Sequence, residues 1–343
     1  MKRILNTLYV MTQGSYLSRK GEAVLISVEH ETKLHVPIHT LEGIVCFGQI
    51  TCSPPMLGLC AERGVSVSFL SEWGKFWARI QGPVAGNILL RKAQYRCSDN
   101  KAMSVEPARS VVIAKIANCR TAILRAARDS SNTNDIQSLK QASDSLKKIL
   151  EDMPKQIELD TVRGKEGMAA RIYFSVLDLQ IKTQKEEFFF KGRTRRPPLD
   201  NFNSLLSFYY TLLVHDIRSA LDTVGLDPAA GFLHRDRPGR PGLALDLMEE
   251  LRPYIADRLA LALVNRKQLK GTGFQKSETG AVVMNEKARK TVIKAYQNRK
   301  QDVINHTFLD EKIHIGLLPH VQAMLMARFL RGDLDGYPPF IWK

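Results

Sequence analysis

The sequence predicts an α+β protein, with an all-β, sandwich-like N-terminal domain (residues 1–90) followed by a larger all-α domain (residues 91–343). Three observations support this division. Short β-branched runs separated by turn residues extend from Ile4 to about Ile88. After Leu89, apolar residues recur at helical spacing instead. Finally, 343 residues suffice for about two packed domains.

Seven short runs in the N-terminal region have the composition of β-strands. Alternation of buried and exposed types is clearest from Ala23 to Val28 and from Val65 to Leu70. A single short helix is predicted from Pro54 to Arg63. The glycines that fit hairpin-like turns are Gly14, Gly21 and Gly64. The expected strands lie in LNTLYV, YLSRKG, AVLISVEH, KLHVPIH, GIVCFGQIT, VSVSFL and FWARIQG.

Polar and proline-rich stretches divide the helical region. Pro107 suits the first turn of a helix, residues 129–135 form a polar break, and Pro253 predicts a bend. The helix before Pro154 has few apolar positions and is expected to face mostly solvent. The expected helices span residues 107–128, 136–151, 159–184, 203–224 and 243–263, with two or three more after Lys287.

Composition favours a globular protein with a polyanionic partner. The chain is 44% hydrophobic and 25% charged, and 50 Lys and Arg against 35 Asp and Glu give a formal charge of +15. The isoelectric point is about 9.6. Such an excess makes a polyanion the first partner to consider. No apolar run approaches the ~20 residues of a membrane span, and the first residues do not resemble a signal peptide, so no membrane contact and a cytoplasmic location are expected.

The five cysteines form no CxxC pair, so neither a disulfide framework nor a zinc site is indicated. They are interpreted as small buried hydrophobes. Motifs for nucleotide binding or serine hydrolysis, such as GxxxxGK[ST], GxGxxG after a strand and GxSxG, are absent, as is HExxH. Gly271 and Gly273 in KGTGF follow a helix, and so predict a flexible basic loop rather than a phosphate loop.

Two basic clusters could bind phosphates. Four of the six residues from 191 to 196 are basic, in a loop interrupted by Pro197 and Pro198. Ten Lys or Arg residues occur between Asn265 and Lys300, where the only acids are Glu278 and Glu286. Either cluster alone could be a solvated face. Together with the global charge they favour contact with a phosphate backbone, since each neutralised phosphate releases a counterion.

Acidic residues and one histidine could do metal chemistry. Asp246 and Glu249 are three residues apart, and therefore share a helix face. His234 lies in a Gly-, Pro- and Arg-rich loop just ahead of that helix, and Glu166 lies between two glycines at or near the start of another. Two carboxylates and an imidazole would suit Mg²⁺ or Mn²⁺. Spacing leaves open whether they meet, and an acidic pair on a helix is more often solvent-exposed.

The other histidines are interpreted as structural. His215 lies on an apolar helix face, and the rest have no ligand-like spacing with an acid. These remaining histidines are His30, His35, His39, His306, His314 and His320.

The chain resembles the CRISPR-associated Cas-one family, the integrase subunit that captures new spacers. The resemblance extends over essentially the whole chain, from the β-rich start through the helical part. The strings that carry it are KEGMAARIYF, DNFNSLLSFYYTLL, GLDPAAGFLHRDRPGRPGLALDLMEELRP and ARFLRGDLDGYPPFIWK. The last of these is most similar to the type I-C branch.

The resemblance implies a set of site residues. Glu166, His234 and Glu249 would coordinate Mg²⁺ or Mn²⁺, and Asp246 would be either a fourth ligand or a partner behind the ligands. Gly242 departs from a serine common in this branch, which removes a hydroxyl cap but no ligand. Basic residues implied to contact DNA backbone are Lys191, Arg193, Arg195, Arg196, Arg235, Arg237, Arg240 and Arg252.

The implied activity is that of a CRISPR adaptation integrase: it joins 3′-hydroxyl ends of captured foreign DNA to the CRISPR repeat without ATP. His234 could instead transfer a proton. The resemblance also implies a homodimer formed through residues 1–90, a heterohexamer-like complex with a Cas-two dimer, and a Cas-four nuclease partner. Two alternatives remain open: a stand-alone metal-dependent nuclease acting on branched or single-stranded DNA, and a non-catalytic basic DNA-binding scaffold.

Overall fold

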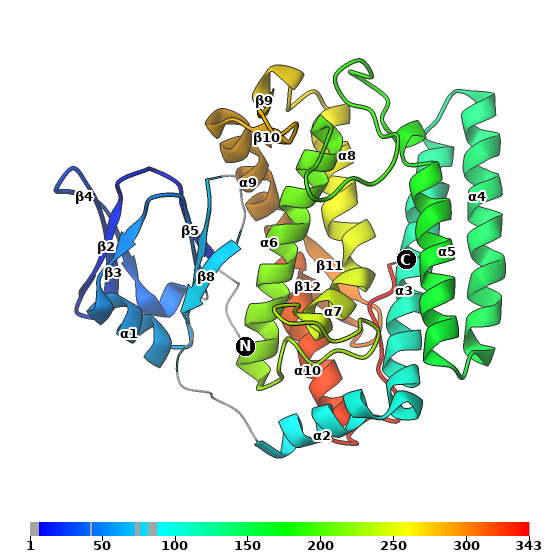
Figure 1. The fold of residues 1–343 in the computed structure, drawn as a ribbon, viewed down its shortest axis with the longest axis horizontal. Helices are drawn as coiled ribbons and strands as arrows, with labels where there is room; N and C mark the ends of the chain where they lie inside the picture. The colour runs from blue at the N-terminus through cyan, green and yellow to red at the C-terminus, as the bar shows by residue number, and fades with distance from the viewer. Residues whose placement is uncertain (1–6, 42, 73–75, 81, 83–87, 343) are drawn as a thin grey trace. The chain divides into compact units, whose positions relative to one another are not determined.

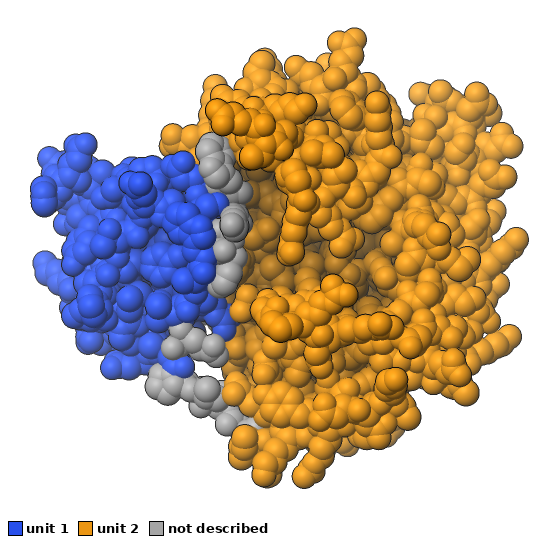
Figure 2. Space-filling model, viewed as in Figure 1, with its two compact units in different colours: residues 1–87 blue, residues 88–343 orange. Residues whose placement is uncertain are grey.

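The computed structural model describes residues 7–41, 43–72, 76–80, 82 and 88–342. Its contacts divide the chain into two units, residues 1–87 and 88–343 (Figures 1 and 2). The division lies close to the predicted boundary after residue 90. Leu5 and Asn6 of the first predicted strand lie outside the described residues. None of the described helices is long and apolar enough to cross a membrane.

Unit 1 contains two four-stranded sheets. Every run that was predicted to be extended contributes a strand. The first sheet has the order β1 (Thr7–Val10), β5 (Gly43–Phe47), β7 (Ser66–Leu70) and β8 (Phe76–Ile80). The second has the order β4 (Glu31–Pro37), β3 (Ala23–Val28), β2 (Tyr16–Lys20) and β6 (Thr51–Cys52).

The expected all-β description of this unit is inexact. Strands β1 and β7 both run parallel to β5, and the predicted helix, α1 (Pro54–Glu62), lies in the connection between β5 and β7. A parallel pair needs such a crossover. Of the three predicted glycine turns, only Gly21 closes a hairpin, between β2 and β3. Gly14 connects strands of different sheets, and Gly64 follows α1.

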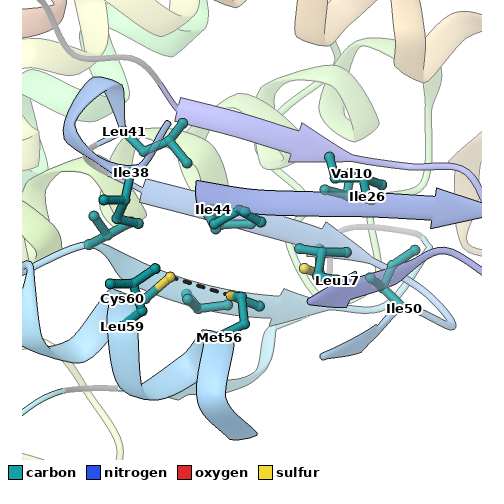
Figure 3. Packing of buried hydrophobic residues seen from close by; sticks show 14 residues of the cluster. Val10, Leu17, Ile26, Ile38, Leu41, Ile44, Ile50, Met56, Leu59 and Cys60 are labelled. Carbon is teal, nitrogen blue, oxygen red and sulfur yellow. Dashed lines mark hydrogen bonds between the residues drawn. The ribbon is translucent and has the colours of Figure 1, made fainter. Parts of the chain in front are cut away.

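The core of unit 1 lies where α1 and strands of both sheets pack together (Figure 3). Leu17 of β2 pairs with Ile26 of β3, and Ile44 of β5 belongs to the same buried cluster. Met56 and Cys60 add the apolar face of α1, and the Cys60 thiol lies 3.4 Å from Met56 Sδ. Alternating strand positions and one helix face thus supply a single core.

Unit 2 is largely helical (Figure 1). Helix α3, the longest of the described helices, packs against α2, α4, α5 and α7. The helices are α2 (Ile88–Asp99), α3 (Lys101–Arg128), α4 (Thr133–Asp152), α5 (Leu159–Ser175), α6 (Asn201–Val224), α7 (Gly242–Arg252), α8 (Arg258–Asn265), α9 (Glu286–Gln301) and α10 (Leu318–Leu330).

Helix boundaries differ from the prediction where capping was not recognised. The Asn100 side chain accepts from the backbone N–H groups of Ala102 and Met103, so α3 begins before Pro107 and contains it. Helix α2 was not predicted. Helix α5 ends at Ser175 rather than at residue 184. Helix α4 exposes most of its residues, as expected, and its one buried face packs against α3 and α5.

The regular α-helix is interrupted at Pro253, where a bend was predicted. Residues Pro253–Asp257 form a π-helical turn between α7 and α8. Proline lacks the N–H that would continue the helical ladder, and a π turn is one way to accommodate it.

Two β-hairpins correct the all-α description of the C-terminal region. The first pairs β9 (Phe274–Lys276) with β10 (Val282–Met284), and the second pairs β11 (Val303–His306) with β12 (Glu311–His314). Gly280, with φ of 79°, supplies the left-handed residue in the first connection. Gly271–Gly273, expected as a basic loop, form a 3-10 turn that leads into β9.

Candidate active site

Two glutamates from different helices meet a buried lysine in unit 2. Glu166 lies on α5 and Glu249 on α7, and both helices pack against α3, which carries Lys115. The Lys115 ammonium lies 2.6 Å from Glu249 Oε2 and forms a closer ion pair with Glu166 Oε1. Since both carboxylates contact one nitrogen atom, they face a single position at which a cation can be held.

Glu166 lies beside open space. It stands in the middle of α5 rather than at the helix start, where it was expected. No heavy atom lies within 4 Å of a Cβ built at Gly164 or Gly167. The Glu166 side chain is 26% exposed, whereas that of Glu249 is 4% exposed. The site is therefore accessible from the α5 side and closed around α7.

His234 lies in the loop between α6 and α7, and its ring is held by Asp246 of α7. His234 Nδ1 is 2.6 Å from Asp246 Oδ1. The same carboxylate accepts the backbone N–H groups of Phe232, Leu233 and His234, at 2.6, 3.0 and 3.0 Å. With Nδ1 donating to Asp246, His234 Nε2 is left as the acceptor nitrogen, and it lies 3.9 Å from Glu249 Oε1.

Two glycines allow this loop to contact the first turn of α7. A Cβ at Gly231 would lie 2.8 Å from Asp246 Oδ2, and one at Gly242 would lie 2.5 Å from the Ala229 carbonyl oxygen. Both distances are shorter than ordinary contacts, so a side chain at either position would push the loop away from the helix. The glycine at position 242 therefore allows the backbone at Ala229 to lie against the start of α7.

A second buried cation completes the charge balance around Glu249. Arg252, one turn further along α7, forms an ion pair with Glu249 Oε1, and its guanidinium lies 4.9 Å from the centre of the Tyr210 ring. Burial raises the pKa of Glu249, but Arg252, Lys115 and His234 lower it more, so this pKa lies below its ordinary value. Burial lowers the pKa of Lys115, and Glu249 and Glu166 more than reverse that effect.

A buried carboxylate lies behind Tyr210. Asp257 accepts the hydroxyl of Tyr210 at 2.7 Å and the hydroxyl of Tyr173 at 3.0 Å. Burial raises the pKa of Asp257 to about 6, because these two hydroxyl groups and more distant arginines compensate only part of the lost hydration. Asp257 therefore supports the ring on which Arg252 packs.

The other side of α7 is held by residues 337–342, here called the C-terminal segment. Glu250 accepts the Tyr337 hydroxyl at 2.6 Å and the Phe340 backbone N–H at 2.8 Å. Asn118 of α3 donates to the backbone carbonyls of Glu250 and Phe340, at 2.7 and 2.9 Å. Burial raises the pKa of Glu250 to about 7. The segment thereby connects α3 and α7 directly behind the site.

The predicted DNA-binding residues fall into two groups. Arg252 contacts Glu249, and Arg193 donates to Asn203 Oδ1 and Ser207 Oγ at 2.8 and 2.9 Å, so both make internal contacts. Arg240 is partly buried. The exposed members of the set are Lys191, Arg195, Arg196, Arg235 and Arg237.

The described contacts of the other histidines involve partners outside this site. His306 is fully buried, and its Nε2 lies 2.9 Å from Gln322 Oε1. His215 is buried on α6, and His314 Nδ1 lies 2.7 Å from the Gln301 carbonyl oxygen. These contacts agree with the structural roles expected for them.

The donor set fits a divalent cation, although the side chains are not arranged around one. Among the described residues, no three His, Cys, Asp or Glu side chains are placed to hold a metal ion. Lys115 lies between Glu166 and Glu249, and Asp246 is engaged by His234 and the backbone. Two donors about 2.1 Å from one ion can be about 4 Å apart, and His234 Nε2 and Glu249 Oε1 meet that limit at 3.9 Å. Glu249 Oε2, the other oxygen of this carboxylate, faces Lys115.

Sequence reasoning missed four residues that shape the site: Lys115, Asn118, Glu250 and Asp257. For Lys115 a signal was present, because it interrupts a helix face that includes Val111, Val112 and Ile116, and lysine is almost never buried without a partner. Nothing comparable marked Glu250, whose donors come from distant parts of the chain.

The fold and the site together describe a two-unit protein whose helical unit presents carboxylate and imidazole donors of the kind that hold divalent cations in phosphodiester chemistry. The sequence model of the family described as CRISPR associated protein Cas1 matches residues 8–298. The chain belongs to this family, which is the Cas-one family of the sequence resemblance.

Curated relatives match the whole chain. It is 56% identical over 343 residues to "CRISPR-associated endonuclease Cas1 1" of Chlorobaculum tepidum, covering 100% of both chains. It is 49% identical over 347 residues to "CRISPR-associated endonuclease Cas1 2" of Rhodospirillum rubrum, again covering 100% of both. A "CRISPR-associated exonuclease Cas4/endonuclease Cas1 fusion" of Geobacter sulfurreducens is 32% identical, over 98% of this chain and 60% of the fusion.

Solved structures share the fold at low identity. A CAS1 protein from Thermotoga maritima aligns with a TM-score of 0.82 at 22% identity, over 98% of this chain and 100% of that one. A casposase bound to integration product gives 0.83 at 20%, over 99% and 95%. A Cas6-RT-Cas1–Cas2 complex gives 0.81 at 22%, over 99% of this chain and 36% of that one.

Proposed function

We propose that this chain is a CRISPR adaptation integrase, a metal-dependent enzyme that joins the 3′-hydroxyl ends of captured DNA to the CRISPR repeat. The chain belongs to the Cas1 family, and its relatives are named CRISPR-associated endonucleases. The observation that carries the proposed site is the approach of Glu166 and Glu249 to one cation position, with His234 Nε2 facing Glu249.

Glu166, Glu249 and His234 would hold Mg²⁺ or Mn²⁺, which when bound supplies Lewis-acid stabilisation of charge at the attacked phosphate. Asp246 acts through His234: it accepts the Nδ1 proton and so aims Nε2 at the ion position. Its remaining acceptor capacity holds three backbone N–H groups of the loop. Asp246 is therefore proposed as a positioning residue rather than a fourth ligand.

The joining reaction exchanges one phosphodiester for another. The 3′ oxygen of the captured DNA bonds to a phosphorus of the repeat, the bond from that phosphorus to its own 3′ oxygen breaks, and the departing oxygen takes up a proton. No ATP is consumed, because the number of phosphodiester bonds is unchanged. The carboxylates orient the reacting groups, and the exposed arginines of the Arg235–Arg240 loop would bind the flanking phosphates.

The proposed DNA contacts are the exposed basic residues near the site. Lys191, Arg195 and Arg196 lie on one loop, and Arg235 and Arg237 lie on the loop that carries His234. Arg193 and Arg252 would act indirectly, by holding their loop and Glu249 in place. Phosphate contacts carry little sequence information, which suits double-stranded DNA of arbitrary sequence.

The proposed assembly is a homodimer joined through the strand-rich residues 1–90, with dimers flanking a Cas-two dimer in a heterohexamer-like complex. The similarity to a Cas6-RT-Cas1–Cas2 complex and to a Cas4/Cas1 fusion supports Cas2 and Cas4 as partners. Assignment to the type I-C branch rests on the ending ARFLRGDLDGYPPFIWK.

A gel assay tests the function. A supercoiled plasmid bearing the repeat is incubated with a labelled short duplex and Mg²⁺ or Mn²⁺, and the label should move to the plasmid. Glu166→Ala, His234→Ala and Glu249→Ala should each abolish joining, while salt-sensitive DNA binding measured without added metal persists. The control Glu151→Ala, on the exposed side of α4, should behave as the unmodified chain.

The same assay distinguishes the alternatives. Fragmentation without joining would identify a stand-alone nuclease. Unchanged behaviour of all three site variants would identify a non-catalytic DNA-binding scaffold. Loss of DNA binding with the fold intact would show that the acidic site and the basic surface are not separate.

A further inference from the structure

Lys115 occupies the position that a bridging metal ion would take. Its ammonium contacts one oxygen of Glu166 and one of Glu249. Its side chain is 8% exposed. Apart from these carboxylates, the described contacts give the ammonium no other oxygen acceptor. A divalent ion shared by Glu166 and Glu249 must therefore displace Nζ or lie against it.

The charges in contact already balance without a metal. Glu166 and Glu249 carry two negative charges, and Lys115 and Arg252 carry two positive ones in direct contact with them. Asp246 is a third carboxylate, but it lies on the far side of His234, where three backbone N–H groups and the ring stabilise it. A divalent ion entering this cluster adds two positive charges. The nearest further carboxylates, Asp246 and Asp257, are separated from the cluster by the His234 and Tyr210 rings.

A DNA phosphate is the anion that can offset them. Like charges a few ångströms apart in a poorly hydrated site repel strongly, so the metal alone binds at a penalty. A phosphate oxygen near the metal attracts both the ion and the displaced ammonium, and the flexible four-carbon stem of lysine lets the ammonium move to reach it. The dianionic transition state of phosphoryl transfer increases this attraction.

We propose that Lys115 is a resident counter-ion that couples metal binding to DNA binding, so that the carboxylate site takes up Mg²⁺ or Mn²⁺ tightly only when a DNA phosphate is present. This inference rests on the proposed ligand set of Glu166, Glu249 and His234. By linkage, the metal must strengthen DNA binding by the same factor. Lys115 is a positioning residue here, because it acts through the two glutamates.

The first test needs no variant. Mn²⁺ binding to the full-length protein is followed by electron paramagnetic resonance, with and without a short duplex, and the Mn²⁺ bound by the duplex alone is subtracted. We expect the Kd for Mn²⁺ to fall at least tenfold when DNA is present. Equal affinity with and without DNA would overturn the coupling.

The second test removes the counter-ion. Lys115→Met should bind Mn²⁺ without DNA at least tenfold more tightly than the unmodified protein, and its dependence on DNA should shrink to less than about threefold. Lys115→Arg keeps a cation and should keep the dependence. Lys147→Met, which removes an exposed lysine of α4, is the matched control and should change neither. Unchanged or weaker Mn²⁺ binding by Lys115→Met would overturn the role of Lys115.

Thermal unfolding gives an independent measurement. Without metal, Lys115→Met should have the lower Tm, because two buried carboxylates lose a shared partner. Mn²⁺ should raise the Tm of this variant by several degrees more than that of the unmodified protein, since a tighter ligand stabilises more. If Lys115→Met does not fold at all, Lys115→Gln and the DNA dependence of the unmodified protein still decide the question.

Failure of the proposed function would look different from failure of this inference. If the ligand set is wrong, Glu166→Gln and Glu249→Gln will leave Mn²⁺ affinity unchanged both with and without DNA. If the ligand set is right and only the counter-ion role is wrong, those two variants will lose Mn²⁺ while Lys115→Met binds it no better than the unmodified chain.

Discussion

Glu249 and Glu250 are neighbours on α7 and have opposite surroundings. Both are buried, at 3% and 0% exposed. Glu249 faces Lys115 and Arg252, which hold its pKa below the ordinary value. Glu250 faces the C-terminal segment and Gln322, where its partners are neutral donors, and burial raises its pKa to about 7.

The contrast shows that burial alone does not decide what a carboxylate can do. Hydrogen bonds from neutral groups compensate part of the hydration that a buried carboxylate loses. A cation in contact compensates more and keeps the carboxylate ionised. Glu249 therefore stays ionised and available to a metal, while Glu250 is used to connect α7 with the C-terminal segment. Of these two adjacent glutamates, Glu249 thus has a chemical role and Glu250 a structural one.

Substitution of the two glutamates gives the largest expected difference. Glu249→Gln should lower the rate of DNA joining at least about 1000-fold, because it removes a charged ligand at the reacting phosphate. Glu250→Gln should stay within about threefold of the unmodified chain. The rates are measured with labelled duplex and plasmid at saturating Mn²⁺. Equal losses in both variants would remove the contrast between the two sides of α7.

Asp246→Asn should have the next largest effect. The amide cannot accept the His234 Nδ1 proton together with all three backbone N–H groups, so Nε2 loses its fixed direction. Loss of such a supporting partner typically costs 10- to 100-fold in metal affinity or activity. Mn²⁺ titration and joining rates check this, with Asp144→Asn on the exposed face of α4 as control. A loss as complete as that of Glu249→Gln would make Asp246 a direct ligand.

Tyr337→Phe tests the structural side of α7. The phenol hydroxyl donates to Glu250 and accepts from Gln322 Nε2. Its removal should lower the free energy of unfolding by about 1–3 kcal/mol, because buried polar partners are left unpaired. Urea unfolding followed by circular dichroism measures the change. Tyr16→Phe, at an exposed strand position, serves as the control, and an equal loss there would remove the significance of the Tyr337 result.

The smallest expected effect is a pH dependence of stability from Asp257. Its pKa is raised from 3.8 to about 6 in the folded protein, so the folded state binds the proton more tightly than the unfolded state does. Stability from this group is therefore greatest at low pH and falls as pH rises through about 6. Between pH 5 and pH 8 the loss is on the order of 1 kcal/mol.

Asp257→Asn should lack this fall, since its amide does not titrate. Unfolding free energies at pH 5 and pH 8 are compared for both chains, and the difference between the chains removes the contribution of all other groups. Parallel pH profiles would mean that the folded structure does not raise the pKa of Asp257.

Much of the fold could be predicted because periodicity is a local property. Alternation marked β3 and β7, helical spacing marked α6 and α7, and Pro253 marked the bend. Helix α2 and the two hairpins were missed, because short amphipathic segments carry weak signals. The carboxylates and His234 were identified from residue type and a family resemblance, and the structure brings them to neighbouring positions.

The rest of the site depends on contacts between distant residues. Lys115 meets Glu166 and Glu249 only because α3 packs against α5 and α7. The environment of Glu250 depends on Tyr337 and Phe340, and no local pattern records that pairing. Residue spacing therefore could not predict that Lys115 lies between Glu166 and Glu249. Nor could it predict the different pKa values of Glu249 and Glu250.

Two of the hydrogen bonds of Glu250 can form only after the C-terminal segment has been synthesised. Two of its donors, Tyr337 and Phe340, lie 87 and 90 residues further along the chain. While a ribosome is still translating that stretch, α7 has been made, but Glu250 lacks two of its hydrogen-bond donors. A product that stops before Tyr337 keeps a poorly compensated carboxylate in its interior, which favours unfolding and removal by proteases over the release of an active DNA-processing enzyme.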